Sequence, residues 1–145
     1  MLRLAATRAD IVGIGLDLRS GQNLNPATAE FGAGALAGAS EAAIEQSVNV
    51  IREVAGSRFD SLELNFLVSH CEVTSSRGEA VAALASRLGV DTETVETCPH
   101  LLVGSVDELR DRLIGLRERL GISDFIFRGN VLEDIMPLVS SLRGM

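Results

Sequence analysis

Tryptophan and tyrosine are absent from this sequence, and aromatic residues make up only 3% of it. A platform of aromatic side chains that stacks the bases of a single strand is therefore not indicated. Basic residues are also in the minority, because 13 lysines and arginines stand against 20 aspartates and glutamates, for a formal charge of −7. This charge would repel a phosphate backbone, so the composition argues against nucleic acid as a partner.

Long hydrophobic runs are missing as well. Arg3, Arg8 and Asp10 interrupt the apolar N-terminal stretch before it forms a signal-peptide core or a span of about 20 apolar residues. Cysteine is scarce, with Cys71 and Cys98 the two examples. Without an export signal, we expect a cytoplasmic protein with two reduced thiols rather than a disulfide, and no membrane partner.

The composition that is present is typical of a globular domain with an aliphatic core. Hydrophobic residues make up 46% of the chain and charged residues 23%. The length of 145 residues predicts a single domain over residues 1–145. A domain of this size buries roughly 68–70% of the surface that its unfolded chain exposes.

A complete helix-and-strand unit is readable at residues 99–127. Ser105 stands three residues before Glu108, the spacing of a capping box, and predicts a helix that begins directly after the serine. Apolar residues then recur every three or four positions, at Leu109, Leu113, Leu116 and Leu120. Gly121 suits the left-handed turn that ends a helix, and residues 122–127 have the β-branched and aromatic content of a strand.

Similar signals predict elements along the rest of the chain. In order, they are the end of a helix at 2–8, a strand at 9–14, a helix at 40–55, a strand at 62–73, a helix at 76–88, a short helix or turn at 91–97 and a final helix at 131–142. Ser76 and Glu79 repeat the capping-box spacing at one helix start. Pro137 is expected to kink the last helix.

Three strand-like runs that alternate with helices indicate an α/β fold with a parallel sheet and right-handed crossovers. The run at 62–73 alternates in polarity, with Leu64 and Phe66 on an apolar face and Glu63 and Asn65 on the other. In a barrel, the polar face would point into the lumen.

Residues 19–38 are rich in glycine and weakly patterned, and they predict a flexible loop or insertion. Gly32, Gly34 and Gly38 superficially resemble a dinucleotide fingerprint, but the last gap is one residue too long and no strand precedes them. We therefore reject that motif.

Two histidine–cysteine groups carry the residues best suited to metal or thiol chemistry. His70 precedes Cys71, and Cys98 is followed two residues later by His100. Neither group has the C-x-x-C spacing of a zinc knuckle, and no third group that would orient a cysteine–histidine nucleophile is evident. Buried structural thiols are the favoured interpretation, and no metal is expected.

Four segments of the chain resemble, in order and spacing, the C-terminal half of luciferase-like oxidoreductases of the coenzyme F-420-dependent branch. They are LRLAATRADIVGI at 2–14, IREVAGSRFDSLELN at 51–65, PHLLVGSVDELRDRL at 99–113 and RERLGISDFIF at 117–127. The resemblance implies an eight-stranded TIM barrel, of which this chain would supply the sixth, seventh and eighth strands. Such barrels need roughly 250 residues, so the chain is expected to form a partial barrel.

The resemblance also implies a cofactor, either coenzyme F-420 or flavin mononucleotide (FMN), and a small-molecule substrate for hydride transfer or monooxygenation. The family's phosphate-binding turn and its early-strand contacts have no counterpart here, so no catalytic residue is assigned. A fragment that is inactive alone and binds no cofactor is the open alternative. Barrel active sites lie at the carboxyl ends of strands, which gives these positional candidates for cofactor contact: Gly15, Asp17, Glu72, Thr74, Phe127 and Arg128.

Two interpretations stay open. The chain leaves the first predicted strand through a segment that contains Gly13, Gly15 and Asp17. This segment is either a turn that contacts a ligand or an ordinary structural turn. For the whole chain, the alternative to an enzyme is a non-catalytic α/β interaction or dimerisation module. A partial barrel leaves two sheet edges open, which predicts a homo-oligomer or pairing with another barrel fragment.

Overall fold

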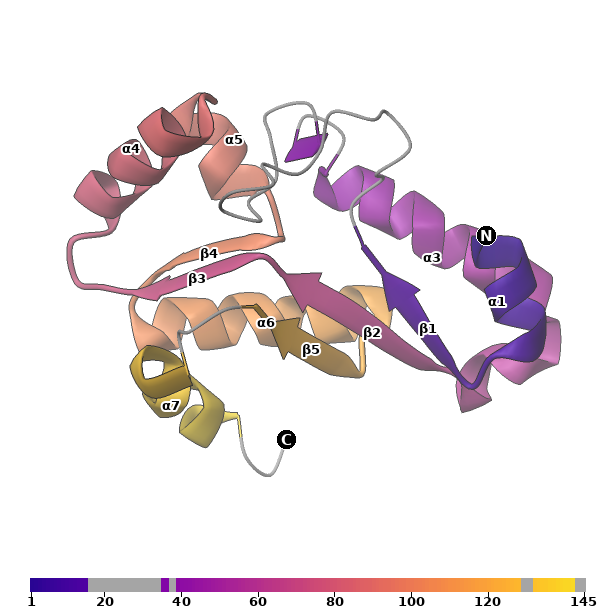
Figure 1. Ribbon diagram of the computed structural model, residues 1–145. Coiled ribbons are helices and arrows are strands. Elements are labelled where there is room, and N and C mark those ends of the chain that lie inside the picture. Colours follow the sequence, from indigo (N-terminus) through magenta and orange to yellow (C-terminus); the bar gives the residue numbers. More distant parts are fainter. Residues whose placement is uncertain (16–34, 37–38, 129–131, 143–145) are drawn as a thin grey trace.

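The computed structural model describes residues 1–15, 35–36, 39–128 and 132–142, and it has the α/β fold with parallel strands that the sequence predicts (Figure 1). Its elements are α1 (Leu2–Arg8), β1 (Ile11–Ile14), α3 (Glu41–Ala55), η2 (Gly56–Ser61), β2 (Glu63–Val68), β3 (His70–Val73), α4 (Arg77–Leu88), α5 (Thr92–Thr97), β4 (Leu101–Gly104), α6 (Val106–Leu120), β5 (Asp124–Phe127) and α7 (Leu132–Ser141). Within these residues the strands form a partial β/α module and no closed barrel.

The first sheet contains β1, β2 and β5 in that order, and both pairings are parallel. Ile11 pairs with Glu63, while Asn65 pairs with Asp124 on the other side of β2. These strands fall in the three runs that the sequence predicts as neighbouring parallel strands, and that prediction is confirmed. Antiparallel pairing at any of them would have excluded a β/α barrel segment.

A second parallel sheet pairs β3 with β4, and the sequence does not predict it. The predicted strand at 62–73 is in fact two strands, separated at Ser69. The backbone N–H groups of Ser69 and His70 both donate to the carbonyl of His100, at 2.8 and 3.2 Å. Two successive residues therefore face one partner residue, the arrangement of a β-bulge, and the long strand changes its neighbour there.

β4 lies on the same side of this long strand as β1 (Figure 1). The N–H of Glu63 donates to the carbonyl of Asp10, before β1, and the N–H of Ser69 donates to His100, before β4. Glu63 and Ser69 are an even number of residues apart in an extended segment, so their N–H groups point to the same edge. β4 therefore follows β1 along that edge, beyond the point where β1 ends.

The two faces of the first sheet differ in how far the described elements cover them. The side chains of Leu64, Phe66 and Val68 are buried in a hydrophobic cluster with leucines of α6 and the apolar side of α3. On the opposite face, Ile11 and Ile126 are 57% and 45% exposed. The predicted alternation of a buried and an open face is confirmed, and the open face is the one that a barrel would turn inward.

A second hydrophobic cluster joins α4 and α5 to β4. Val81, Leu84, Val95 and Leu101 are buried in it. Ala35 and Leu36, inside the predicted loop at 19–38, are helical and also buried there. The rest of that predicted loop lies outside the described residues.

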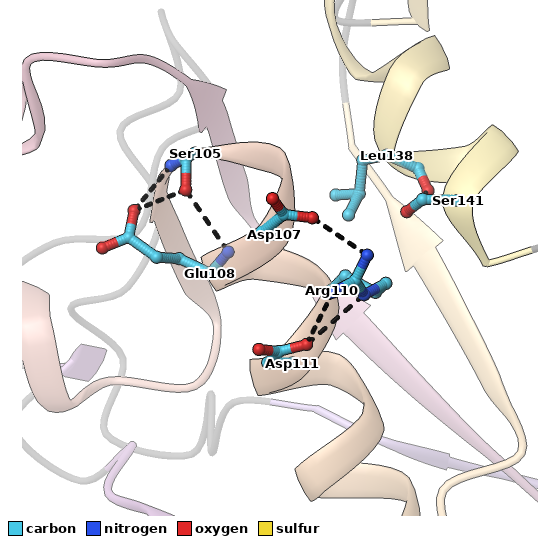
Figure 2. Close-up of polar contacts among 7 residues, drawn as sticks. All are labelled: Ser105, Asp107, Glu108, Arg110, Asp111, Leu138 and Ser141. Atoms are coloured by element: carbon cyan, nitrogen blue, oxygen red, sulfur yellow. Dashed lines mark hydrogen bonds and ion pairs between the residues drawn. The ribbon is translucent and has the colours of Figure 1, made fainter.

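Helix starts follow the predicted caps with one correction. The Ser105 hydroxyl accepts from the N–H of Glu108 at 3.4 Å, and the Glu108 carboxylate accepts from the N–H of Ser105 at 2.8 Å, so this capping box is formed (Figure 2). At α4 the predicted box is wrong, because the Ser76 side chain makes no capping hydrogen bond. Its N–H instead donates to the Thr74 hydroxyl at 3.1 Å.

Arg58 of η2 connects that segment to the C-terminal end of α1. The Arg58 guanidinium donates to the carbonyls of Ala6 and Ala9 at 3.1 and 2.7 Å, and to the Asp10 carboxylate at 2.8 Å. These carbonyls lie at the C-terminal end of α1, where backbone acceptors lack helical partners.

Among the helices that the structure describes, none has the length and apolar character to cross a membrane.

Candidate functional site at the carboxyl ends of the strands

The carboxyl ends of β1, β2 and β5 meet at one edge of the first sheet. The N–H of Arg128, directly after β5, donates to the carbonyl of Val68 at the end of β2, at 3.2 Å. Gly15 follows β1 at the same edge, and among the described residues nothing lies within 4 Å of a Cβ placed there. Ligands of parallel α/β sheets bind outside the carboxyl ends of strands, so this edge is the candidate site.

His100 fills the gap where β1 ends and β4 has not yet begun. Its side chain is 1% exposed, and the ring stacks on Phe66 with centroids 4.3 Å apart. Nδ1 lies 2.6 Å from the carbonyl oxygen of Leu67, and because that oxygen can only accept, Nδ1 carries the proton. The imidazole thus donates a hydrogen bond to the Leu67 carbonyl at the edge of the sheet.

Burial lowers the pKa of His100 below its ordinary value of 6.5, and the hydrogen bond to Leu67 opposes that shift. A buried imidazole that is neutral and already bonded to the backbone is a structural group. The candidate zinc ligand of the sequence analysis is therefore a core residue.

A polar cluster lies further along the long strand, on β3. His70 Nε2 is 3.5 Å from a carboxylate oxygen of Glu72, and His70 Nδ1 is 3.4 Å from a guanidinium nitrogen of Arg87. Arginine can only donate, so this contact favours the tautomer with the proton on Nε2, facing Glu72. Both ring nitrogens of His70 are therefore directed at side chains of the protein itself.

Sequence reasoning finds Glu72 and His70 but not Arg87. The arginine comes from α4, 17 residues further along the chain than His70. No local spacing connects the two, since their approach depends on how α4 packs over the sheet of β3 and β4. A prediction of this cluster would need the tertiary arrangement first.

The positional candidates divide into three groups. Gly15, Phe127 and Arg128 lie at the shared carboxyl edge of the first sheet. Glu72 and Thr74 lie at the end of β3, in the second sheet, and Thr74 is engaged by the start of α4 and by the carbonyl of Gly104. Asp17 lies outside the described residues.

The open face of the first sheet carries a second polar feature. The Asn65 side-chain amide donates to the Asp124 carboxylate at 2.7 Å, across β2 and β5. Both side chains share that face with the exposed Ile11 and Ile126. A hydrogen-bonded carboxylate therefore lies on this face, at the amino end of β5.

Both cysteines are buried, in separate clusters. Cys71 packs with α6 and β2 and Cys98 with α4 and β4. Burial raises the pKa of the Cys71 thiol to about 12 and also raises that of Cys98. Neither is a thiolate near neutral pH, so neither is a ready nucleophile. The described residues contain no group of three or more histidines, cysteines and acids that could hold a metal ion.

No protein-family profile and no curated protein matches the sequence. Among solved structures, this chain is similar to riboflavin lyase, determined with modified FMN and its substrate riboflavin, with a TM-score of 0.54 and 15% identity. The match covers 98% of this chain and 40% of the chain of riboflavin lyase. At this identity the likeness concerns the fold alone, and the present chain spans less than half the length of that enzyme.

Proposed function

We propose that this chain is the closing portion of a β/α-barrel oxidoreductase that uses FMN or coenzyme F-420, of the luciferase-like class that the sequence resembles. The observation that carries the proposal is the parallel sheet β1–β2–β5, with three strand ends meeting at one edge. The fold likeness to a protein solved with modified FMN supports it.

The described residues fit the periphery of such a cofactor site. Gly15 leaves open space at the strand end, which admits a flat ring or a phosphate close to the backbone. Arg128, at the end of β5, would supply a cation for a phosphate or carboxylate group. Glu72 and Thr74, at the end of β3, would lie toward the substrate side. The bound cofactor would supply hydride transfer, and the chain's residues would orient and shield it.

The test is a titration of the purified chain with FMN and, separately, with coenzyme F-420, followed by difference absorbance and by thermal stability. We expect a spectral shift with one of them and an increase in melting temperature that grows with ligand concentration. Arg128→Gln should weaken binding about tenfold, the loss of one charge-assisted hydrogen bond. Arg110→Gln is the matched control, because Arg110 pairs with Asp107 and Asp111 on the surface of α6 (Figure 2).

Two results contradict this proposal. One is the absence of any spectral or thermal response to both cofactors at millimolar concentration. The other is equal weakening by both arginine variants, which would mean that general positive charge, rather than the strand edge, governs the response.

A second candidate function is a non-catalytic interaction module. The observation that favours it is the open sheet: among the described strands, β1 and β5 each pair only with β2, so each has an unpaired outer edge. Sedimentation velocity separates the two functions, because an interaction module associates without any cofactor.

A further inference from the structure

The two outer edges of the first sheet each adjoin an apolar groove. At β1, the groove has a volume of about 590 Å³ and is lined by residues of α1 and β1, including Leu4, Ala5 and Arg8. At β5, the groove has a volume of about 470 Å³ and is lined by α6, β5 and Leu142, including Phe125 and Glu118. Such surfaces beside an unpaired strand are suited to a further β/α layer.

Exposed apolar side chains concentrate at the same edges. Met1, Leu4 and Ile11 are 107%, 66% and 57% exposed at the β1 edge, and Ile126 is 45% exposed on β5. One other large apolar side chain in the described residues is comparably exposed, Met136 on α7. Within the described residues, most of the exposed large apolar side chains therefore belong to the two edge strands and to the N-terminal segment that precedes β1.

The groove at β1 carries one charged side chain, Arg8, whereas the groove at β5 carries Glu118 next to Arg117. Arg8 closes α1 and lies just before β1, so it is at the amino end of that strand. Glu118 lies near the end of α6, so it is at the amino end of the other edge strand, β5. If β1 and β5 of different molecules lie side by side and parallel, Arg8 and Glu118 fall at the same level.

We propose that copies of this chain associate head to tail, with β1 of one copy parallel to β5 of the next and Arg8 facing Glu118. Such a contact is heterologous, because it joins two different surfaces, and it closes into a ring or continues as a chain according to its rotation. The association gives the interaction-module candidate its partner, a second copy of the chain, and rests on that candidate. It does not depend on a cofactor.

The test is sedimentation velocity of the whole chain over a hundredfold range of concentration, at 0.15 M salt. The wild type should form species larger than its 15.4 kDa monomer. Arg8→Glu and Glu118→Arg should each weaken association about tenfold or more, because each places like charges across the contact. Glu93→Arg is the matched control, since Glu93 is exposed on α5 away from both edges and the charge change is the same as in Glu118→Arg.

Mixing the two variants provides the decisive measurement. In a head-to-tail assembly, the glutamate introduced by Arg8→Glu would face the arginine introduced by Glu118→Arg, and the native Arg8 and Glu118 would meet at the next contact. An equimolar mixture should therefore recover the wild-type association, as should the double variant. A contact between two β1 edges would give no such recovery, and that result overturns the proposal.

A wild type that stays monomeric at every concentration also overturns it and would assign the edges to a different β/α polypeptide. The cofactor titration is run on Arg8→Glu as well. If Arg8→Glu binds FMN normally but the wild type does not associate, the self-association proposal is refuted and the oxidoreductase proposal is not. If the wild type associates but no cofactor binds, the oxidoreductase proposal is refuted and the self-association proposal is not.

Discussion

Two helices, α4 and α6, begin with a Ser-x-x-Glu motif, and the structure shows a capping box at α6 and none at α4. Ser105 and Ser76 have the same spacing to a glutamate and the same position before a helix. At α6 the Ser105 hydroxyl lies 2.8 Å from a Glu108 carboxylate oxygen and accepts from the Glu108 N–H. At α4 the Ser76 hydroxyl caps nothing, because the backbone has a φ of −104° and a ψ of 54°. Equivalent Ser→Ala substitutions should therefore have unequal effects.

The expected sizes follow from the hydrogen bonds lost. Ser105→Ala removes the donor to the Glu108 carboxylate and the acceptor for the Glu108 N–H, a loss of about 1 kcal/mol in the free energy of unfolding. That corresponds to about 4 °C in melting temperature for a chain of this size. Ser76→Ala removes no capping bond and should change stability by less than about 0.5 kcal/mol.

The assay is urea unfolding followed by far-UV circular dichroism, since the chain has no tryptophan or tyrosine for fluorescence. The hydrogen bonds from Ser105, first of all its N–H, hold the pKa of Glu108 below its ordinary value of 4.5. The contribution of the Glu108 carboxylate is therefore present above that value and lost as the pH falls through the lower, folded value. The difference in the free energy of unfolding between the wild type and Ser105→Ala should therefore be smaller at pH 3 than at pH 7. Equal destabilisation by the two serine variants at pH 7 would refute the reasoning.

Three further predictions concern His100, the two cysteines and Arg58. Because the folded pKa of His100 is below 6.5, wild-type stability should fall as the pH drops below 6.5, and His100→Gln should flatten that dependence in urea unfolding. Cys71 and Cys98 should resist iodoacetamide in the native state and react in urea, so rapid native labelling would contradict their burial. Arg58→Met should cost about 2 kcal/mol, because it leaves backbone carbonyls without a donor, whereas Arg119→Met, which breaks a surface ion pair with an α3 glutamate, should cost under about 1 kcal/mol.

The helices and the first sheet are predictable because their signals are local. Ser105 and Gly121 bracket α6 as expected, and Gly121 has the left-handed φ of 71° that a helix end needs. The alternation along β2 identifies its buried face. In each case the property lies within a few neighbouring residues, so no tertiary information is required.

β4 is not predictable in the same way. Leu101, Leu102, Val103 and Gly104 are all buried, so the run shows no alternation, and a strong helix start follows at once. The bulge at Ser69 also has no sequence mark, because it arises where the long strand changes partner from β1 to β4. The division into two sheets is therefore a tertiary result.

The candidate site also has one part that local sequence signals predict and another part that depends on tertiary packing. The rule that strand ends meet places Gly15 and Arg128 at the same carboxyl edge of the sheet, on either side of β2. The same rule fails for Thr74, because β3 has left the first sheet by then. The contact of Arg87 with His70 depends on packing between α4 and β3, which no spacing encodes.

The open face connects the cofactor proposal with the association proposal. The Asn65–Asp124 hydrogen bond lies on a face that copies arranged head to tail would begin to enclose. A ligand that prefers the enclosed face must strengthen association by the same factor by which association strengthens its binding. Added FMN should thus shift the sedimentation of the wild type toward larger species. If binding and association are both found but show no such linkage, the cofactor contacts the outer rim at Arg128 and not the enclosed face.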